Sequence, residues 1–212
     1  MTRADSPSTV IFDLGGVLID WNPRYLFRRL FDDEAQMERF LAEVCNPIWN
    51  IEQDAGRPFE EAVAHAVEHH PEFSDMVRAY HERWPETLGG ALEGTVAILE
   101  QLDAAGVPLY ALTNFSGETF HHARALFPFL GLFRGIVVSG DERLVKPDPR
   151  IYHRLLQRYA LDPKACVFID DSPPNVLAAQ HYFGMCALRF TDPERLRADL
   201  VRLGLPLPAK ES

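Results

Sequence analysis

Six residues that could carry out chemistry lie at the ends of short apolar runs or in loops beside them: Asp13, Thr113, Asn114, Lys146, Asp170 and Asp171. Clustered carboxylates repel one another unless a cation neutralises them, and oxygen ligands suit Mg²⁺. A carboxylate can attack a phosphoryl group to give an acyl phosphate. A lysine and amide N–H groups can stabilise the charge on the transferring group. If they converge, these side chains predict magnesium-assisted phosphoryl chemistry.

The apolar runs beside these residues are typical of buried parallel strands, because they are short and do not alternate with polar residues. We predict strands at 9–12, 107–113, 135–139, 166–169 and 185–188. Helical patterns separate them, at 95–105 and after Asp148-Pro149, Ser172-Pro173 and Asp192-Pro193, where a capping residue precedes proline. The alternation predicts an α/β fold with a Rossmann-like, doubly wound parallel sheet. Ligands bind such sheets beyond the carboxyl ends of the strands, where the six residues lie.

Residues 21–90 break this alternation, because they carry helical patterns and no convincing strand. Within them we predict helices at 23–31, 33–45, 58–70 and 72–84. The chain is therefore expected to form a core from residues 1–20 and 91–212. A small helical domain of residues 21–90 would be inserted after the first strand, with substrate bound between the two.

Composition narrows the class of protein. Of 212 residues, 47% are hydrophobic, and the net charge of −10 argues against a nucleic-acid partner, since phosphate backbones are held by clustered Lys and Arg. No apolar run approaches the roughly 18 residues of a membrane helix, and the polar N-terminus does not resemble a signal peptide. We expect a cytoplasmic protein that binds no membrane, with Cys45, Cys166 and Cys186 as reduced thiols. Its oligomeric state is left open.

Four segments around the six residues resemble the four signatures of the haloacid dehalogenase-like hydrolases, in the same order. They lie at 12–18 (FDLGGVL), 112–114 (LTN), 146–152 (KPDPRIY) and 168–172 (FIDDS). The resemblance covers essentially the whole chain. It implies a Rossmann-like core, a helical cap of the first cap class, and Mg²⁺-dependent hydrolysis of a small phosphorylated substrate.

The resemblance also implies roles for individual residues. Asp13 would be the nucleophile and a metal ligand, and Lys146 would pair with Asp13 and the phosphoryl group. The remaining implied Mg²⁺ ligands are Asp170, Asp171 and the carbonyl of Gly15. The implied contacts to the phosphoryl group and substrate come from Gly15, Gly16, Thr113, Asn114, Lys146 and, in the cap, Trp49 and Asn50.

One position departs from the pattern of the family. Most of its phosphatases carry a second aspartate two residues after the nucleophile as general acid and base, and here that position is Gly15. General acid–base catalysis is typically worth about 10² to 10⁴ in rate. The variant is similar to a subgroup that includes α-D-glucose-1-phosphate phosphatases, whose anomeric leaving group needs less protonation. We therefore hypothesise a sugar phosphate substrate. Asp20 is either a turn or hinge residue or a substitute acid.

Two other functions are compatible with the same fold. A metal-independent 2-haloacid dehalogenase would use Asp13 to attack carbon, but the fourth signature of those enzymes lacks the carboxylate pair found at Asp170 and Asp171. A non-catalytic regulator would not need to keep Lys146 together with both carboxylates. The residues present favour the phosphatase.

Overall fold

The computed structural model describes residues 7–208, and its centre is a parallel sheet of five strands. In spatial order the strands are β5 (Gly135–Val138), β4 (Leu109–Thr113), β1 (Thr9–Phe12), β6 (Cys166–Asp170) and β7 (Cys186–Arg189). The five predicted strands are confirmed, with ends shifted by two residues at most. The central strand, β1, pairs with β4 and β6 in parallel, so the ends of these three strands meet at one edge.

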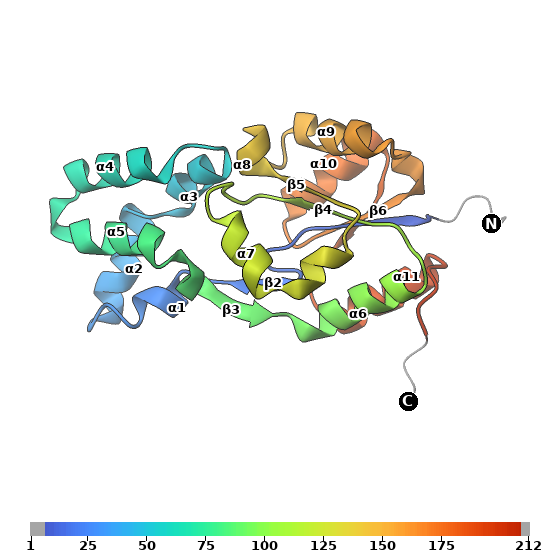
Figure 1. Cartoon of the computed structure of the whole chain (residues 1–212), viewed down its shortest axis with the longest axis horizontal. Coiled ribbons are helices and arrows are strands. Elements are labelled where there is room, and N and C mark those ends of the chain that lie inside the picture. Colours follow the sequence, from blue (N-terminus) through green and yellow to red (C-terminus); the bar gives the residue numbers. More distant parts are fainter. Residues whose placement is uncertain (1–6, 209–212) are drawn as a thin grey trace.

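Helices cover both faces of the sheet (Figure 1). On one face lie α6 (Glu93–Ala104) and α11 (Pro193–Arg202), and on the other α9 (Pro149–Tyr159) and α10 (Pro173–Phe183). The side chains of β1 alternate between these layers. Val10 and Phe12 pack in one hydrophobic cluster, and Ile11 packs in the other. The predicted doubly wound α/β architecture is confirmed.

The three helix starts predicted from a capping residue before proline are confirmed, at Pro149, Pro173 and Pro193, and two of the capping side chains make the expected hydrogen bond. The side chain of Asp148 accepts a hydrogen bond from the Arg150 N–H at 2.9 Å, and Asp192 accepts one from the Arg195 N–H at 2.8 Å. At the other end of α10, Gly184 adopts a left-handed conformation with φ of 64°, which ends the helix.

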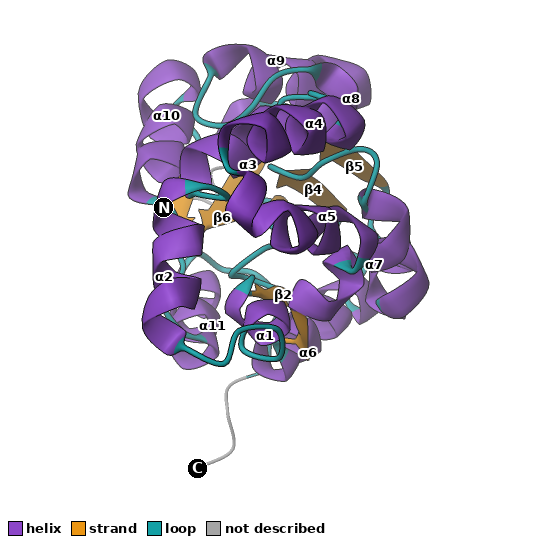
Figure 2. Cartoon of the chain, turned by 90° about the vertical axis from the view of Figure 1, so that its left-hand side faces the viewer, coloured by secondary structure: helices purple, strands orange, loops and turns teal. Residues whose placement is uncertain are grey.

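A second group of helices lies together at one end of the molecule (Figures 1 and 2). They are α1 (Arg24–Phe27), α2 (Glu34–Glu43), α3 (Pro47–Asp54), α4 (Phe59–His69) and α5 (Ser74–Glu82). Aromatic rings fill the space between them; the ring centroids of Phe27 and Phe40 are 4.9 Å apart, and those of Trp49 and Tyr80 are 5.0 Å apart. The sequence pattern did not predict α3 as a separate helix.

The shorter helical elements are the helices α7 (Phe120–Leu126) and α8 (Ser139–Glu142), and the 3₁₀ turns η1 (Pro71–Phe73), η2 (Trp84–Thr87), η3 (Pro128–Leu132) and η4 (Pro163–Ala165). Among the residues described, none of the helices has both the length and the apolar character needed to cross a membrane.

The prediction that residues 21–90 contain no strand is wrong. Strand β2 (Ile19–Trp21) pairs antiparallel with β3 (Leu88–Ala91). Strands of three and four residues, one with two glycines, are too short to show the alternation that identifies a strand. The chain passes from the sheet to the helical group through β2 and returns through β3, so this ribbon connects the two parts. The predicted division at 20/21 and 90/91 therefore falls inside the ribbon, and the domain division itself stays a prediction.

Candidate active site

A buried lysine holds two carboxylates at the carboxyl end of the sheet. The Lys146 Nζ lies 2.9 Å from Oδ1 of Asp13, at the end of β1, and 2.6 Å from Oδ2 of Asp170, at the end of β6. The side chains of Lys146 and Asp170 are fully buried, and that of Asp13 is 11% exposed. The sequence predicted that these three residues would converge, and the structure brings them together.

The charges of this group do not balance. Burial lowers the pKa of Lys146, but Asp13 and Asp170 raise it by more, so the ammonium stays charged. Burial raises the pKa of Asp13 to about 7; Lys146 opposes this shift and Asp170 adds to it. One ammonium faces two buried carboxyl groups, and the raised pKa of Asp13 shows that its negative charge is not fully compensated here. The excess of negative charge favours a cation at this site.

Asp171 completes the cluster of carboxylates. Carboxylate oxygens of Asp13, Asp170 and Asp171 lie within 4.8 Å of one another, which is a spacing suited to a single cation. Asp171 is exposed and lies over Gly16, where a Cβ atom would meet its Oδ2 at 2.7 Å. Gly16 also has φ of 72°, so a side chain here would be strained and would displace Asp171.

Asn175 orients Asp170 and was not among the predicted site residues. Its Nδ2 donates to Oδ1 and Oδ2 of Asp170 at 3.0 and 3.1 Å, and the Ser172 N–H donates to Oδ1 at 2.9 Å. Asn175 lies in the first turn of α10, a short distance after the fourth signature. Its position there was the one sequence signal, and it suits a capping residue equally well.

Thr113, the last residue of β4, and Asn114, the next residue, differ in their hydrogen bonds. Thr113 is buried, and within the described residues its Oγ1 has no hydrogen-bond partner. A bound group could supply that partner. The Asn114 amide instead holds the lysine loop, because its Oδ1 accepts from the Lys146 N–H at 2.8 Å and its Nδ2 donates to the Lys146 carbonyl at 3.0 Å.

Two backbone N–H groups close to Asp13 already have hydrogen-bond acceptors within the protein. The Leu14 N–H donates to Oδ1 of Asp13 at 2.7 Å, and the Gly16 N–H donates to the Ile19 carbonyl at 2.9 Å. The Gly16 amide, which the resemblance assigned to the phosphoryl group, is therefore used within its own loop. Gly15 borders the cavity described next.

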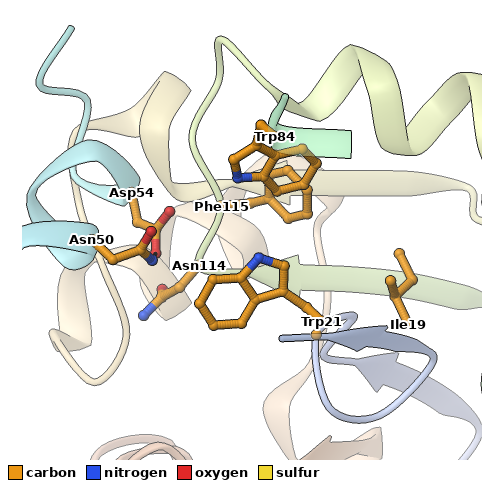
Figure 3. A pocket seen from close by; sticks show the side chains of 8 residues that line it. Ile19, Trp21, Asn50, Asp54, Trp84, Asn114 and Phe115 are labelled. Carbon is orange, nitrogen blue, oxygen red and sulfur yellow. Dashed lines mark hydrogen bonds between the residues drawn. The ribbon is translucent and has the colours of Figure 1, made fainter. Parts of the chain in front are cut away.

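A cavity of about 90 Å³ lies between the sheet edge and the helical group. It is lined by Gly15, Ile19, Trp21, Asn50, Asp54, Trp84, Asn114 and Phe115. Figure 3 shows Asn50 and Asp54 reaching it from the same helix, α3, with the two indole rings and Phe115 on the other sides. Asn50 was predicted here, whereas Asp54 had no local sequence signal.

Two candidate residues from the sequence lie elsewhere. Trp49 is buried, and its ring contacts Phe59 and Tyr80 in the interior of the helical group rather than lining the cavity. Adjacent helical residues point in different directions, so Trp49 and Asn50 do not share a face. Asp20 accepts a hydrogen bond from the Tyr25 hydroxyl at 2.6 Å, which favours its role in the ribbon over that of a substitute acid.

Known proteins of similar sequence include two phosphatases. The chain is 27% identical to the sesquiterpene phosphatase astK of Aspergillus oryzae over 188 residues, covering 86% of this chain and 89% of that protein. It is 26% identical to the phosphorylated carbohydrates phosphatase of Thermotoga maritima, covering 81% of this chain and 79% of the relative.

Solved structures share the fold. A HAD family enzyme from Bacteroides thetaiotaomicron, in complex with magnesium and inorganic phosphate, superposes with a TM-score of 0.66 at 21% identity. The superposition covers 87% of this chain and 94% of that one. The sequence profile described as haloacid dehalogenase-like hydrolase matches residues 7–182. The chain thus belongs to the haloacid dehalogenase-like hydrolase family.

Proposed function

We propose that this hydrolase is a Mg²⁺-dependent phosphatase that cleaves a small phosphate monoester through an aspartyl-phosphate at Asp13. The observation that carries the proposal is the position of Asp13, at the end of the central strand, 2.9 Å from the buried Lys146 ammonium and beside two further carboxylates. A nucleophile needs such neighbours if it is to approach a dianionic phosphoryl group.

The residues present fit a magnesium ion. Three carboxylates with oxygens within 4.8 Å of one another and a single ammonium leave a net negative charge, and hard oxygen ligands are the donors that Mg²⁺ prefers. Asp13 and Asp171 would hold the ion together with Asp170, and the Gly15 carbonyl is a further candidate. Bound there, Mg²⁺ would neutralise charge on the phosphoryl oxygens.

The protein's own groups account for the first chemical step. An Asp13 carboxylate oxygen attacks phosphorus while the bond to the leaving oxygen breaks. Lys146 compensates negative charge on the carboxylate and the transferring group, and the Thr113 hydroxyl donates to a phosphoryl oxygen. In the second step, water attacks the phosphorus and the bond to Asp13 breaks, which releases phosphate and restores the carboxylate.

We infer that the leaving group is a small sugar-like alcohol. Trp21 and Trp84 offer aromatic faces, and Asn50 and Asp54 offer polar atoms that can bind hydroxyl groups (Figure 3). The similarity to a phosphorylated carbohydrates phosphatase supports this choice. The similarity to a sesquiterpene phosphatase supplies the competing choice of an apolar alcohol.

Phosphate release from a panel of sugar 1-phosphates, sugar 6-phosphates and prenyl phosphates, with and without Mg²⁺, tests the proposal. We expect Mg²⁺-dependent release that Asp13→Asn lowers by about 10⁴-fold or more, because the nucleophile is lost. We also expect sugar 1-phosphates to be cleaved best. Halide release from 2-chloropropionate without metal would identify a dehalogenase instead, and a lack of both activities would favour a regulator.

A further inference from the structure

The loop after the nucleophile leaves space where a catalytic acid would ordinarily project. Gly15 has no side chain, and a Cβ atom placed there would find no other atom within 4 Å. Gly15 also lines the cavity beneath the helical group. A side chain that serves as proton donor for the leaving group would therefore have to come from another element.

Asp54 is the one ionisable side chain among the residues that line the cavity. The other lining residues are apolar, aromatic or neutral amides. Figure 3 shows the Asp54 carboxylate entering from α3, close to the Asn50 and Asn114 side chains. Asp54 and Gly15 therefore line the same cavity.

The surrounding residues fix the position of Asp54. The Asn50 Nδ2 donates to its Oδ2 at 3.1 Å, one helical turn earlier on α3. The Ser139 hydroxyl, at the start of α8, donates to its backbone carbonyl at 2.6 Å. Ser139 is fully buried and its Oγ also accepts from the Phe115 N–H at 2.8 Å. The helix end that carries Asp54 is thus tied to the sheet edge.

We propose that Asp54 is the general acid and base of this enzyme and replaces the carboxylate that Gly15 lacks. The proposal rests on the phosphatase function argued above. As Asp13 attacks phosphorus and the bond to the leaving oxygen breaks, the Asp54 carboxyl gives that oxygen its proton and the alcohol departs. The Asp54 carboxylate then takes a proton from the attacking water, while the bond between phosphorus and Asp13 breaks.

The protonation of Asp54 suits both steps. Burial raises its pKa to about 7, although the Ser116 backbone N–H and the Lys146 charge lower it. The last turn of a helix, where carbonyl groups are unpaired, also disfavours a negative charge. Near neutral pH the group can therefore both give and accept a proton.

A series of aryl phosphates tests the proposal, because phenyl and 4-nitrophenyl phosphate share one ring shape but differ in the acidity of the leaving group. In Asp54→Asn, we expect kcat/KM for phenyl phosphate to fall by about 10²-fold or more, and that for 4-nitrophenyl phosphate to change by about threefold at most. Glu52→Gln is the matched control, because this exposed carboxylate on α3 pairs with Arg57. It should leave both values unchanged.

Gly15→Asp in the Asp54→Asn background supplies a second readout. Since Gly15 has room for a side chain, the double variant should regain activity on phenyl phosphate. An equal loss on both esters, no loss on either, or no recovery in the double variant would overturn the proposal. Failure of the wild type to release phosphate with Mg²⁺ would instead refute the phosphatase function, which separates the two claims.

Discussion

Lys146 shows how one residue sets the electrostatics of the site. Its ammonium is fully buried and is shared between Asp13 and Asp170. Removing one partner of a buried ion pair typically costs about 3–5 kcal/mol, because the other charge is left uncompensated. Lys146→Met should therefore lower the free energy of unfolding by about that amount in urea denaturation. A variant as stable as the wild type would contradict the burial of these charges.

Asp171 should carry the response of the protein to magnesium. A ligand at 100 times its Kd adds about 2.7 kcal/mol, which for a chain of this size is roughly 5–10 °C in Tm. Asp171→Ala should abolish this Mg²⁺-dependent shift in a thermal melt. Asp103→Ala, which removes an exposed carboxylate on α6, should keep it. An unchanged shift in Asp171→Ala would remove this residue from the metal site.

Asp54 should make stability depend on pH. Its pKa rises from an ordinary 3.8 to about 7 on folding, so the folded state binds the proton more tightly than the unfolded state. Stability from this group is then fully present below about pH 4 and is lost as pH rises to about 7. Asp54→Asn should therefore be more stable than the wild type at about pH 8 and equally stable at about pH 4. A pH-independent difference in Tm would contradict this.

The elements that position the site could be predicted where a short stretch of sequence identifies the element by itself. The strands β1, β4 and β6 are short apolar runs, and a parallel sheet places their ends together, so the convergence of Asp13, Thr113 and Asp170 followed from the sequence. Asp54 could not be predicted in the same way. Its place at the cavity depends on how α3 packs against α8, which is a contact between residues 85 positions apart. The β2–β3 ribbon was missed because neither strand is long enough to show the alternation of polar and apolar residues that identifies a strand.

The junction of α3 with α8 should be sensitive to the Ser139 hydroxyl. Its loss in Ser139→Ala would leave the Asp54 carbonyl and the Phe115 N–H without partners. A buried unsatisfied group costs about 1–3 kcal/mol, so the free energy of unfolding should fall by that amount. Ser74→Ala, at the start of α5 and away from this junction, is the control. Equal stability of both variants in urea would show that the hydrogen bonds of Ser139 do not stabilise this junction.

At the scale of the whole molecule, the helical group covers the site. The cavity of about 90 Å³ is small, and polar contacts bridge α4 and the loop before α7, where the Phe59 N–H donates to Glu118 at 3.2 Å. We therefore expect the helical group to move as substrate enters, with the β2–β3 ribbon as its connection. Hydrogen exchange in α3 and α4 should slow when Mg²⁺ and orthovanadate are added. Unchanged exchange would indicate a rigid cap.

The most direct test of the account concerns the covalent state of Asp13. Enzyme that is mixed with substrate and Mg²⁺, quenched in acid and reduced with borohydride should contain homoserine at position 13, because borohydride reduces an acyl phosphate and leaves a free carboxylate intact. Peptide mass spectrometry would read this change, and it should require substrate. Phosphate release with an unreduced Asp13, or with reduction at another carboxylate, would contradict the assignment of Asp13 as the nucleophile.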